Sequence, residues 1–291
     1  MTEGIIIKGV GGFYYVSNAD GVYECRARGI FRKENIKPMV GDKVKIQIID
    51  EKKKKGNVEV IEERKNSLIR PRVANVDQAI IVFAAASPNI NLDLLDRFIV
   101  LVEEQELEAV ICINKTDLDK EENYKAIADT YRKAGYKVIT VCALKGENVD
   151  LLKETLRDKI SVFAGPSGVG KSSLINCLNP DFRLETGEVS AKIERGRHTT
   201  RHAQLMELFE NSFIVDSPGF SSLFLDHIDK DKLKYYFREF EDYNDTCYYN
   251  GCSHTHEPDC SVKEKVGTEI SQERYDRYVS LYNELAEERK K

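Results

Sequence analysis

Short runs of alternating apolar and polar residues, separated by turn-forming pairs such as Gly11-Gly12 and Gly41-Asp42, fill residues 1–68. Alternation with a period of two is typical of β-strands, because successive side chains point to opposite faces. The pattern predicts strands at residues 4–10, 13–17, 22–27, 43–50 and 57–62. Five strands in so short a segment favour a small closed barrel, and the OB-fold is the commonest such barrel that binds oligonucleotides.

The middle of the chain alternates between apolar runs and longer segments with apolar residues at helical spacing. We expect buried strands at 77–84, 107–113, 137–142 and 161–164, and helices at 92–105, 126–134 and 149–159. Such alternation is typical of a parallel sheet covered by helices on both faces, with functional loops at the carboxyl ends of the strands. Near the C-terminus, helical spacing over 271–286 predicts an amphipathic helix whose tyrosine face packs.

Composition restricts where the protein works. No apolar run approaches the roughly 20 residues of a membrane span, and the N-terminus lacks a signal-peptide pattern. We therefore expect a cytoplasmic protein that does not bind membranes. The net charge of −5 is unevenly distributed, since residues 1–68 carry 14 basic and 10 acidic side chains, a balance of +4. The basic excess lies on the predicted barrel.

That barrel has the residues of an RNA-binding surface. Its aromatic side chains would stack on bases, and its basic side chains would neutralise phosphates. The aromatic set is Phe13, Tyr14, Tyr15, Tyr23 and Phe31, and the basic set is Arg26, Arg28, Arg32, Lys33 and Lys52 to Lys55. The alternative interpretation is that the aromatic residues form the barrel core and the lysines a solvated hairpin tip.

A phosphate-binding loop follows the strand at 161–164. The sequence Gly165-Pro166-Ser167-Gly168-Val169-Gly170-Lys171-Ser172 matches G-x-x-x-x-G-K-[ST] and leads into a helix that starts near Lys171. Its backbone N–H groups would cradle the phosphates, Lys171 would reach the β- and γ-phosphates, and Ser172 would bind Mg²⁺. We include the adjoining Ser173 among the nucleotide-binding residues.

The sequence Asn114-Lys115-Thr116-Asp117 indicates which base is bound. Asp117 can accept hydrogen bonds from N1–H and the exocyclic amine of guanine, whereas facing adenine it would lose about 1–3 kcal/mol as an unpaired buried group. Asn114 would join loops together and Lys115 would lie along the base. In the segment Cys142-Ala143-Leu144, the N–H of Ala143 would donate to guanine O6.

Two further motifs complete the set for a guanine nucleotide. Asp216 follows an apolar strand at 213–215 and would hold Mg²⁺ through water, while the N–H of Gly219 would sense the γ-phosphate. Between this motif and the phosphate loop lies His198-Thr199-Thr200, in which we assign Thr200 to Mg²⁺. The base-reading motif therefore comes before the phosphate loop, the reverse of the common order. This order predicts a circularly permuted GTPase, which is possible because domain termini often lie close together.

With these motifs the chain resembles the ribosome-small-subunit-dependent GTPase A family of bacteria. The resemblance covers the barrel, the linker at 70–78, the permuted motifs, Gly196-Arg197-His198-Thr199-Thr200-Arg201 and a cysteine-rich tail. It implies an OB domain, a permuted GTPase domain, a zinc domain and a role in late maturation of the small ribosomal subunit. The implied partners are GTP or GDP, the small subunit and its rRNA.

The group that activates water for GTP hydrolysis is left open by the sequence. Phe220 follows the glycine of the last motif, where Ras-like GTPases often have a glutamine, and an apolar ring cannot orient a nucleophile. His198 could supply the polar group, or the ribosome could supply one in trans. The alternative interpretation of His198 is a structural residue of its loop. The candidate catalytic residues are His198, Lys171, Thr199 and Thr200.

The tail contains Cys247, Cys252, His254 and Cys260 within 14 residues. Three thiolates and one imidazole suit tetrahedral Zn²⁺, so we expect one structural zinc ion in addition to Mg²⁺ with GTP. His256 is a rival ligand, and the family resemblance favours His254. The expected fold is thus an α/β circularly permuted P-loop GTPase domain at 69–225, with an all-β OB-fold barrel at 1–68 and a zinc-binding α-helical domain at 226–291.

The predicted function is that of a monomeric ribosome-associated GTPase that the small subunit stimulates. One alternative is a GTP-regulated RNA-binding module in which hydrolysis is incidental. Another is a metabolic enzyme that uses GTP, but the chain shows no separate constellation of residues for an acceptor substrate.

Overall fold

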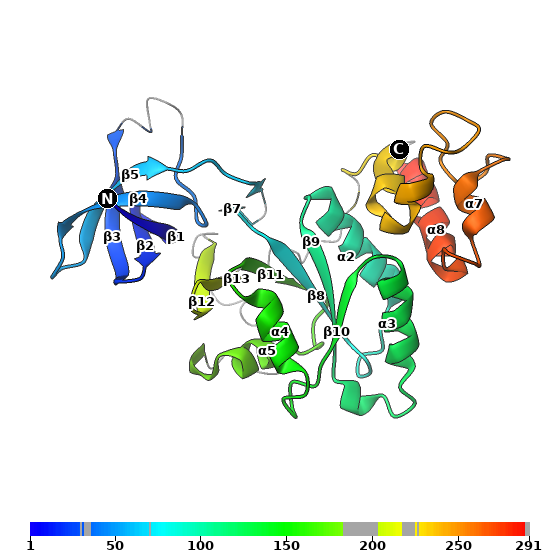
Figure 1. Ribbon diagram of the computed structural model, residues 1–291, viewed down its shortest axis with the longest axis horizontal. Coiled ribbons are helices and arrows are strands. Elements are labelled where there is room, and N and C mark those ends of the chain that lie inside the picture. The colour runs from blue at the N-terminus through cyan, green and yellow to red at the C-terminus, as the bar shows by residue number, and fades with distance from the viewer. Residues whose placement is uncertain are drawn as a thin grey trace. The chain divides into compact units, whose positions relative to one another are not determined.

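The structure of the protein is a computed structural model that describes residues 1–29, 31, 36–69, 71–182, 203–216, 225 and 227–288 (Figure 1). It contains two compact units, each built from separate stretches of sequence. The first comprises Met1–Gln78, Leu152–Phe163 and Ile175–Ser221, and the second comprises Ala79–Leu151, Ala164–Leu174 and Ser222–Lys291.

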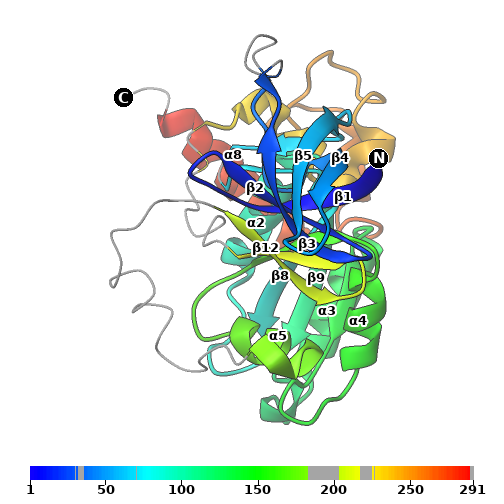
Figure 2. The same cartoon turned by 90° about the vertical axis from the view of Figure 1, so that its left-hand side faces the viewer.

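The N-terminal strands form a closed five-stranded barrel in the order β1-β2-β3-β5-β4 (Figure 2). The strands are β1 (Thr2–Val10), β2 (Phe13–Asn18), β3 (Gly21–Ala27), β4 (Lys43–Asp50) and β5 (Lys55–Ile61). Strand β1 pairs antiparallel with both β2 and β4, while β3 runs parallel to β5, which closes the barrel. All five predicted strands and the predicted OB-fold barrel are confirmed.

The barrel core separates the two interpretations of the aromatic residues. Tyr23 and Phe31 are buried in it, so these two pack rather than stack on bases. Phe13, Tyr14 and Tyr15 are only half-buried, and the Arg26 guanidinium lies 4.9 Å from the Phe13 ring centroid. Each of these three rings is therefore partly exposed, although Tyr14 also packs against the barrel core.

The lysine-rich turn between β4 and β5 also divides into two groups. The Lys54 ammonium donates to the Asp20 carbonyl at 3.0 Å and the Tyr23 hydroxyl at 3.1 Å, so it stabilises the barrel. Lys52 and Lys53 are exposed at the tip. Two other basic residues of the predicted surface, Arg32 and Lys33, lie outside the described residues.

A two-stranded sheet of β6 (Ser67–Leu68) and β7 (Val73–Ala74) follows the barrel, and a six-stranded sheet has the order β10-β9-β8-β11-β13-β12. Its strands are β8 (Gln78–Ala84), β9 (Glu108–Asn114), β10 (Lys137–Thr140), β11 (Ile160–Ala164), β12 (Gln204–Phe209) and β13 (Ser212–Asp216). β9 and β10 pair in parallel, as do β11 and β13, whereas β12 pairs antiparallel with β13. The predicted parallel arrangement is confirmed, and β12 was not predicted.

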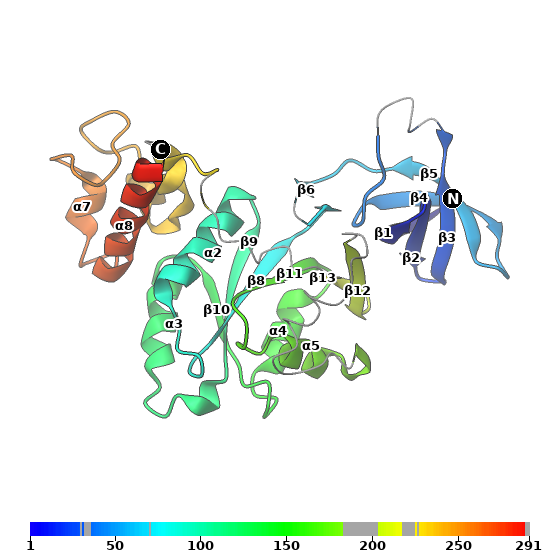
Figure 3. The same ribbon diagram turned by 180° about the vertical axis from the view of Figure 1, so that it is seen from behind.

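Four α-helices connect these strands: α2 (Leu92–Glu104), α3 (Asn123–Lys133), α4 (Val149–Leu156) and α5 (Lys171–Leu178). Helix α2 packs on β9 and α3 packs on β10 (Figure 3). Helix α4 ends before the predicted residue 159, because Asp158 has a φ of 55° and its N–H donates to the Ser212 hydroxyl at 2.9 Å. Short 3₁₀ helices are η1 (Thr116–Leu118) and η2 (Pro180–Phe182).

The C-terminal region consists of η3 (Lys230–Tyr236), η4 (Arg238–Tyr243), α7 (Ser261–Lys265) and α8 (Gln272–Glu288). Helix α8 confirms the predicted amphipathic helix. Its Tyr278 is fully buried, and its ring meets Phe237 and Phe240 edge to face at 5.0 and 4.9 Å. The tyrosine face therefore packs, as expected. Within the described ranges, no helix has the length and apolar character needed to cross a bilayer.

A buried arginine joins α8 to the helices of the sheet in the same unit. Arg274 donates to Asp96 of α2 at 2.6 Å and to Glu239 of η4 at 3.1 Å. The rings of Tyr131, Tyr136 and Phe237 surround its guanidinium at 4.8 to 5.5 Å. Because a buried charge is strongly destabilising without its partner, this network requires all of its members.

We predict that Arg274→Met lowers the free energy of unfolding by about 3–5 kcal/mol. The substitution leaves the buried Glu239 carboxylate without its cation, and it removes one of the two arginines, Arg274 and Arg277, that pair with Asp96. Urea denaturation followed by circular dichroism measures the change. Arg157→Met is the matched control, since the exposed Arg157 pairs with the exposed Glu154, and such a pair contributes little. Equal denaturation midpoints for the two variants would contradict the role of Arg274.

Candidate active site and metal centre

The loop at 165–170 connects the end of β11 to the start of α5. Gly165 has a φ of 127°, and a Cβ there would lie 2.1 Å from the Val82 carbonyl oxygen. Gly170 has a φ of 96°, and a Cβ there would lie 2.4 Å from the Asn114 amide nitrogen. Only glycine fits at these two positions, so glycine is what permits the loop to approach β8 and the end of β9.

Lys171 occupies the inside of this loop. Its ammonium donates to the carbonyl oxygens of Gly165 and Pro166, both at 2.7 Å, and burial lowers its pKa. Ser172 and Ser173 follow in the first turn of α5, where free N–H groups and the helix dipole favour an anion. The loop is therefore shaped for phosphate, with a cation at its centre.

The side chains of Asn114 and Lys115 attach the base-reading motif to this loop. The Asn114 amide donates to the Val169 carbonyl at 3.0 Å, and its oxygen accepts from the Ala143 N–H at 3.2 Å. The Lys115 ammonium donates to the Gly168 carbonyl at 2.7 Å. Thr116 donates to the Val141 carbonyl at 3.3 Å. The motif thus contacts both the phosphate loop and the segment after β10.

Asp117 lies beside the thiol of Cys142, which donates to its Oδ1 at 3.1 Å. Burial, followed by the hydrogen bond to Asp117, raises the pKa of Cys142, so the thiol stays protonated and can donate. The N–H of Ala143, which we expected to face guanine O6, donates to Asn114 in this structure. Leu144 is 88% exposed.

The structure thus gathers residues 114–117, 142–144 and 165–172, which are far apart in the sequence. The other predicted residues of the nucleotide site, His198, Thr199, Thr200 and Gly219, lie outside the described residues, as does Phe220. Asp216 ends β13, and only its backbone is described.

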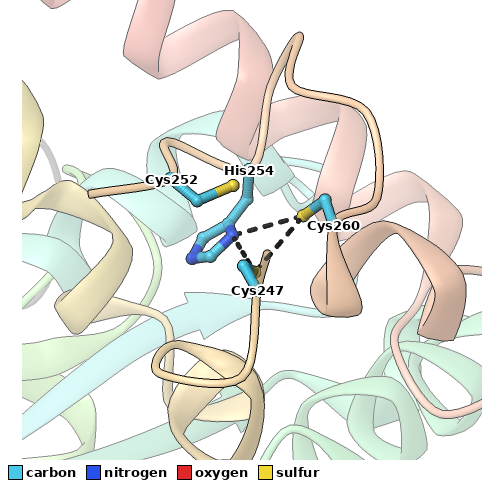
Figure 4. Close-up of side chains that lie close together, drawn as sticks. All are labelled: Cys247, Cys252, His254 and Cys260. Atoms are coloured by element: carbon cyan, nitrogen blue, oxygen red, sulfur yellow. Dashed lines mark hydrogen bonds between the residues drawn. The ribbon is translucent and has the colours of Figure 1, made fainter. Parts of the chain in front are cut away.

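The four predicted metal ligands lie together in the C-terminal region (Figure 4). The ligand atoms of Cys247, Cys252, His254 and Cys260 are all within 4.8 Å of one another. The Cys247 and Cys260 sulfurs are 3.8 Å apart, and His254 Nδ1 is 3.5 and 3.3 Å from them. Tetrahedral zinc with ordinary bond lengths separates two sulfurs by about 3.8 Å and a sulfur from a nitrogen by about 3.5 Å. The cluster therefore fits a metal ion such as zinc.

The structure also distinguishes the two histidines of this segment. His254 is fully buried in the cluster, whereas the His256 side chain is 80% exposed and contacts Thr255. Burial, followed by the charge of Lys234, lowers the pKa of His254 to about 4. The imidazole is therefore neutral at neutral pH, as a metal ligand must be.

Side chains from other elements hold the loop that carries Cys252 and His254. The Lys234 ammonium donates to the Cys252 carbonyl at 3.0 Å, Tyr278 donates to the Ser253 carbonyl, and Tyr275 donates to the His254 carbonyl at 2.8 Å. Three consecutive carbonyls are thus capped from η3 and α8. Sequence reasoning missed this role of Lys234 and of the two tyrosines, because none of them belongs to a motif.

Two protein-family models match this chain. The family model for the RsgA GTPase matches residues 61–226, and the model for the RsgA N-terminal domain matches residues 3–58. The chain belongs to the RsgA GTPase family. The family resemblance drawn from the motifs is confirmed, and membership makes the chain a GTP-hydrolysing enzyme.

Relatives of this RsgA family member match along its whole length. Proteins of Caldanaerobacter subterraneus subsp. tengcongensis and Clostridium perfringens, both called small ribosomal subunit biogenesis GTPase RsgA, are each 49% identical to it. The matches cover 99% of this chain, and 97% and 99% of the two relatives.

Two solved structures share the fold. One is YloQ, described as a circularly permuted GTPase, with a TM-score of 0.82 and 40% identity over 99% of this chain and 96% of that one. The other is YjeQ from Thermotoga maritima, with a TM-score of 0.83 and 38% identity over 98% of each chain. The predicted circular permutation of this RsgA family member is confirmed.

We predict Mg²⁺-dependent binding of GTP and GDP in strong preference to ATP. Asp117→Asn should weaken GTP binding by about 10–100-fold, because it removes a charged acceptor worth about 1–3 kcal/mol. Competition against a fluorescent GDP analogue measures these affinities. The matched control is Asp129→Asn, an exposed carboxylate on α3 that pairs with Arg132. Equal affinities for ATP and GTP would overturn the assignment.

We predict one tightly bound zinc ion per chain in protein purified without chelator. His254→Ala should lose the metal and His256→Ala should keep it, because only His254 lies in the cluster. Elemental analysis gives the zinc content. Zinc removal should also accelerate amide exchange in α8, whose Tyr275 and Tyr278 donate to the ligand loop. Unchanged zinc content in His254→Ala would remove it from the ligand set.

Proposed function

We propose that this chain is a GTPase of small ribosomal subunit biogenesis, and that the subunit stimulates its hydrolysis of GTP to GDP and phosphate. The observation that carries the proposal is full-length similarity, at 49% identity, to proteins named for this role. The site of action is the cytoplasm, and the protein acts as a monomer whose partners are GTP or GDP and the subunit with its rRNA.

In this proposal, RNA binding, GTP hydrolysis and a second contact with the subunit belong to three different domains. Residues 1–68 bind rRNA, residues 69–225 bind and hydrolyse GTP, and residues 226–291 form a zinc-supported second contact with the subunit. Ser172 and Thr200 bind the Mg²⁺ ion that accompanies GTP, and Asp216 holds it through water. Lys171, which now donates to loop carbonyls, turns its ammonium to the phosphates.

The surface of the barrel supports contact with RNA. A hollow of about 610 Å³ on the barrel is lined by Phe13, Tyr14, Lys37, Arg64 and Arg72 among others. Aromatic faces beside fixed cations suit unpaired bases and phosphates. Lys52 and Lys53, exposed at the β4–β5 turn, add positive charge. Because the barrel carries the basic excess of the chain, it is the domain best suited to rRNA.

The small subunit would supply or position the polar group that orients the attacking water. Phe220 stands after the glycine of the Asp216 motif, so no glutamine orients water there. We propose that docking on the subunit brings either His198 or an rRNA group to the γ-phosphate. With either group, GTP hydrolysis is slow in the isolated protein and faster when the protein is bound to the subunit.

We predict that purified small subunits accelerate GTP turnover, as measured by phosphate release with and without subunits. Lys52→Glu/Lys53→Glu should weaken this stimulation and reduce the slope of log affinity against log salt by about 1–2, because each lysine neutralises about one phosphate. The matched control reverses two exposed charges outside the barrel, Lys133→Glu/Lys137→Glu. Both variants should bind GDP normally.

The same assay separates the alternatives. Turnover that subunits do not change would favour the GTP-regulated RNA-binding module, and equal stimulation of the two charge-reversal variants would remove the lysine tip from the contact. His198→Ala should lower stimulated turnover more than GTP affinity if His198 orients the water. Unchanged stimulated turnover in that variant would assign the group to the ribosome.

A further inference from the structure

The metal centre contains one contact that no ligand motif includes. Nε2 of His254 lies 2.8 Å from Oδ1 of Asn244, on the side of the ring opposite the cysteine sulfurs. On the other side, Nδ1 lies 3.5 Å from the Cys247 sulfur and 3.3 Å from the Cys260 sulfur. We propose that Asn244 is the positioning residue of this centre: it accepts a hydrogen bond from Nε2–H of His254 and so directs the Nδ1 lone pair to the metal.

The protonation of the ring follows from the chemistry of the cluster. A neutral imidazole has one N–H and one lone pair, and a metal ion takes the lone pair. Since Nδ1 faces the sulfurs, Nδ1 must carry the lone pair and Nε2 the proton. A protonated Nε2 needs an acceptor, so Asn244 must present its carbonyl oxygen rather than its NH₂ group. The orientation of both side chains is thereby determined.

Helix η4 holds the ring from two directions. Asn244 follows the last residue of η4, and its N–H donates to the Phe240 carbonyl at 2.9 Å. The ring of Phe240 itself meets the His254 ring edge to face, with centroids 5.9 Å apart. One short helix and the residue that follows it therefore supply both an apolar wall and a hydrogen-bond acceptor, and together these contacts restrict the tilt and rotation of the imidazole.

The backbone of His254 also has an unusual conformation that other residues hold in place. His254 has a φ of 59°, in the left-handed region that costs a non-glycine residue about 1 kcal/mol or more. The Tyr275 hydroxyl holds its carbonyl at 2.8 Å. The backbone and the far ring nitrogen are thus held by separate contacts, and Nδ1 lies among the sulfurs. Removing an acceptor that holds a metal-binding histidine typically lowers metal affinity by about 10–100-fold.

A spectrum of the zinc-loaded full-length protein tests the ring orientation. The chain has five histidines, so a long-range ¹H–¹⁵N correlation spectrum can resolve each imidazole. We expect a metal-bound Nδ1 and a protonated Nε2 for His254, assigned by comparison with His254→Ala. A metal-bound Nε2 would overturn the proposal.

Release of zinc to a chromogenic chelator tests the role of Asn244. Asn244→Leu removes the acceptor at similar volume and should release zinc about 10–100-fold faster than the parent protein. Asn244→Asp keeps an acceptor for Nε2–H and should release it at the parent rate or more slowly. The control is Asn250→Leu, an exposed asparagine between Cys247 and Cys252, which should behave like the parent.

GDP affinity, which involves none of these residues, reports whether each variant is folded. Equal zinc release from Asn244→Leu and the parent protein, with GDP affinity intact, would overturn the proposal. If Asn244→Leu fails to bind GDP, two other measurements test the proposal. One is the rate of zinc release from Asn244→Asp compared with Asn250→Leu, and the other is the state of the His254 ring nitrogens in the spectrum of the parent protein. Faster release from Asn244→Asp than from the parent would also overturn it.

Discussion

The nucleotide site depends on the side-chain amide of Asn114. Because the chain is permuted, the base-reading motif precedes the phosphate loop, and Asn114 and Val169 are 55 residues apart in the sequence. The amide bridges the two by donating to the Val169 carbonyl and accepting from the Ala143 N–H. A glycine at 170 is what leaves room for it, since any Cβ would contact the amide nitrogen. Asn114 and Gly170 therefore require one another.

The C-terminal region is held by two different kinds of interaction. Arg274 ties α8 to α2 through buried charge pairs, and the loop that carries Cys252 and His254 is tied to α8 by the hydroxyls of Tyr275 and Tyr278. Replacing a whole buried ion pair by apolar groups is often neutral, whereas removing one partner is strongly destabilising. A metal ion that binds the folded site but not the unfolded chain adds its binding free energy to the stability of the fold. Together these contacts join the ligand loop, η4 and α8 within the C-terminal region.

The barrel shows how one set of residues divides between structure and function. Tyr23 and Lys54 contact each other and stabilise the barrel, whereas Tyr15 and Lys53, of the same residue types, are half-buried and exposed, respectively. A ring or an ammonium group is available to RNA only where the fold leaves it exposed. The composition of the segment could identify a basic aromatic domain, but not the residues that face a partner.

By itself the sequence determined the features whose signals are local or depend on motif order. A period of two in the apolar positions marked the five barrel strands, and the order of Asp117, Lys171 and Asp216 showed the permutation. The spacing from Cys247 to Cys260 identified a metal site because residue type and short separation alone limit the ligands. β12 was missed, since Gln204–Phe209 becomes a strand only by pairing with β13.

Only the tertiary structure decided which groups meet across long separations. It placed Arg274 against Asp96, 178 residues away, and it brought Asn244 to the far nitrogen of His254. It also ended α4 at Leu156, because the N–H of Asp158 donates to the hydroxyl of Ser212 in β13. Such contacts leave no periodicity or motif in the chain, since each depends on the packing of whole elements. The sequence therefore specifies the chemistry of each site, and the fold selects the partners that orient it.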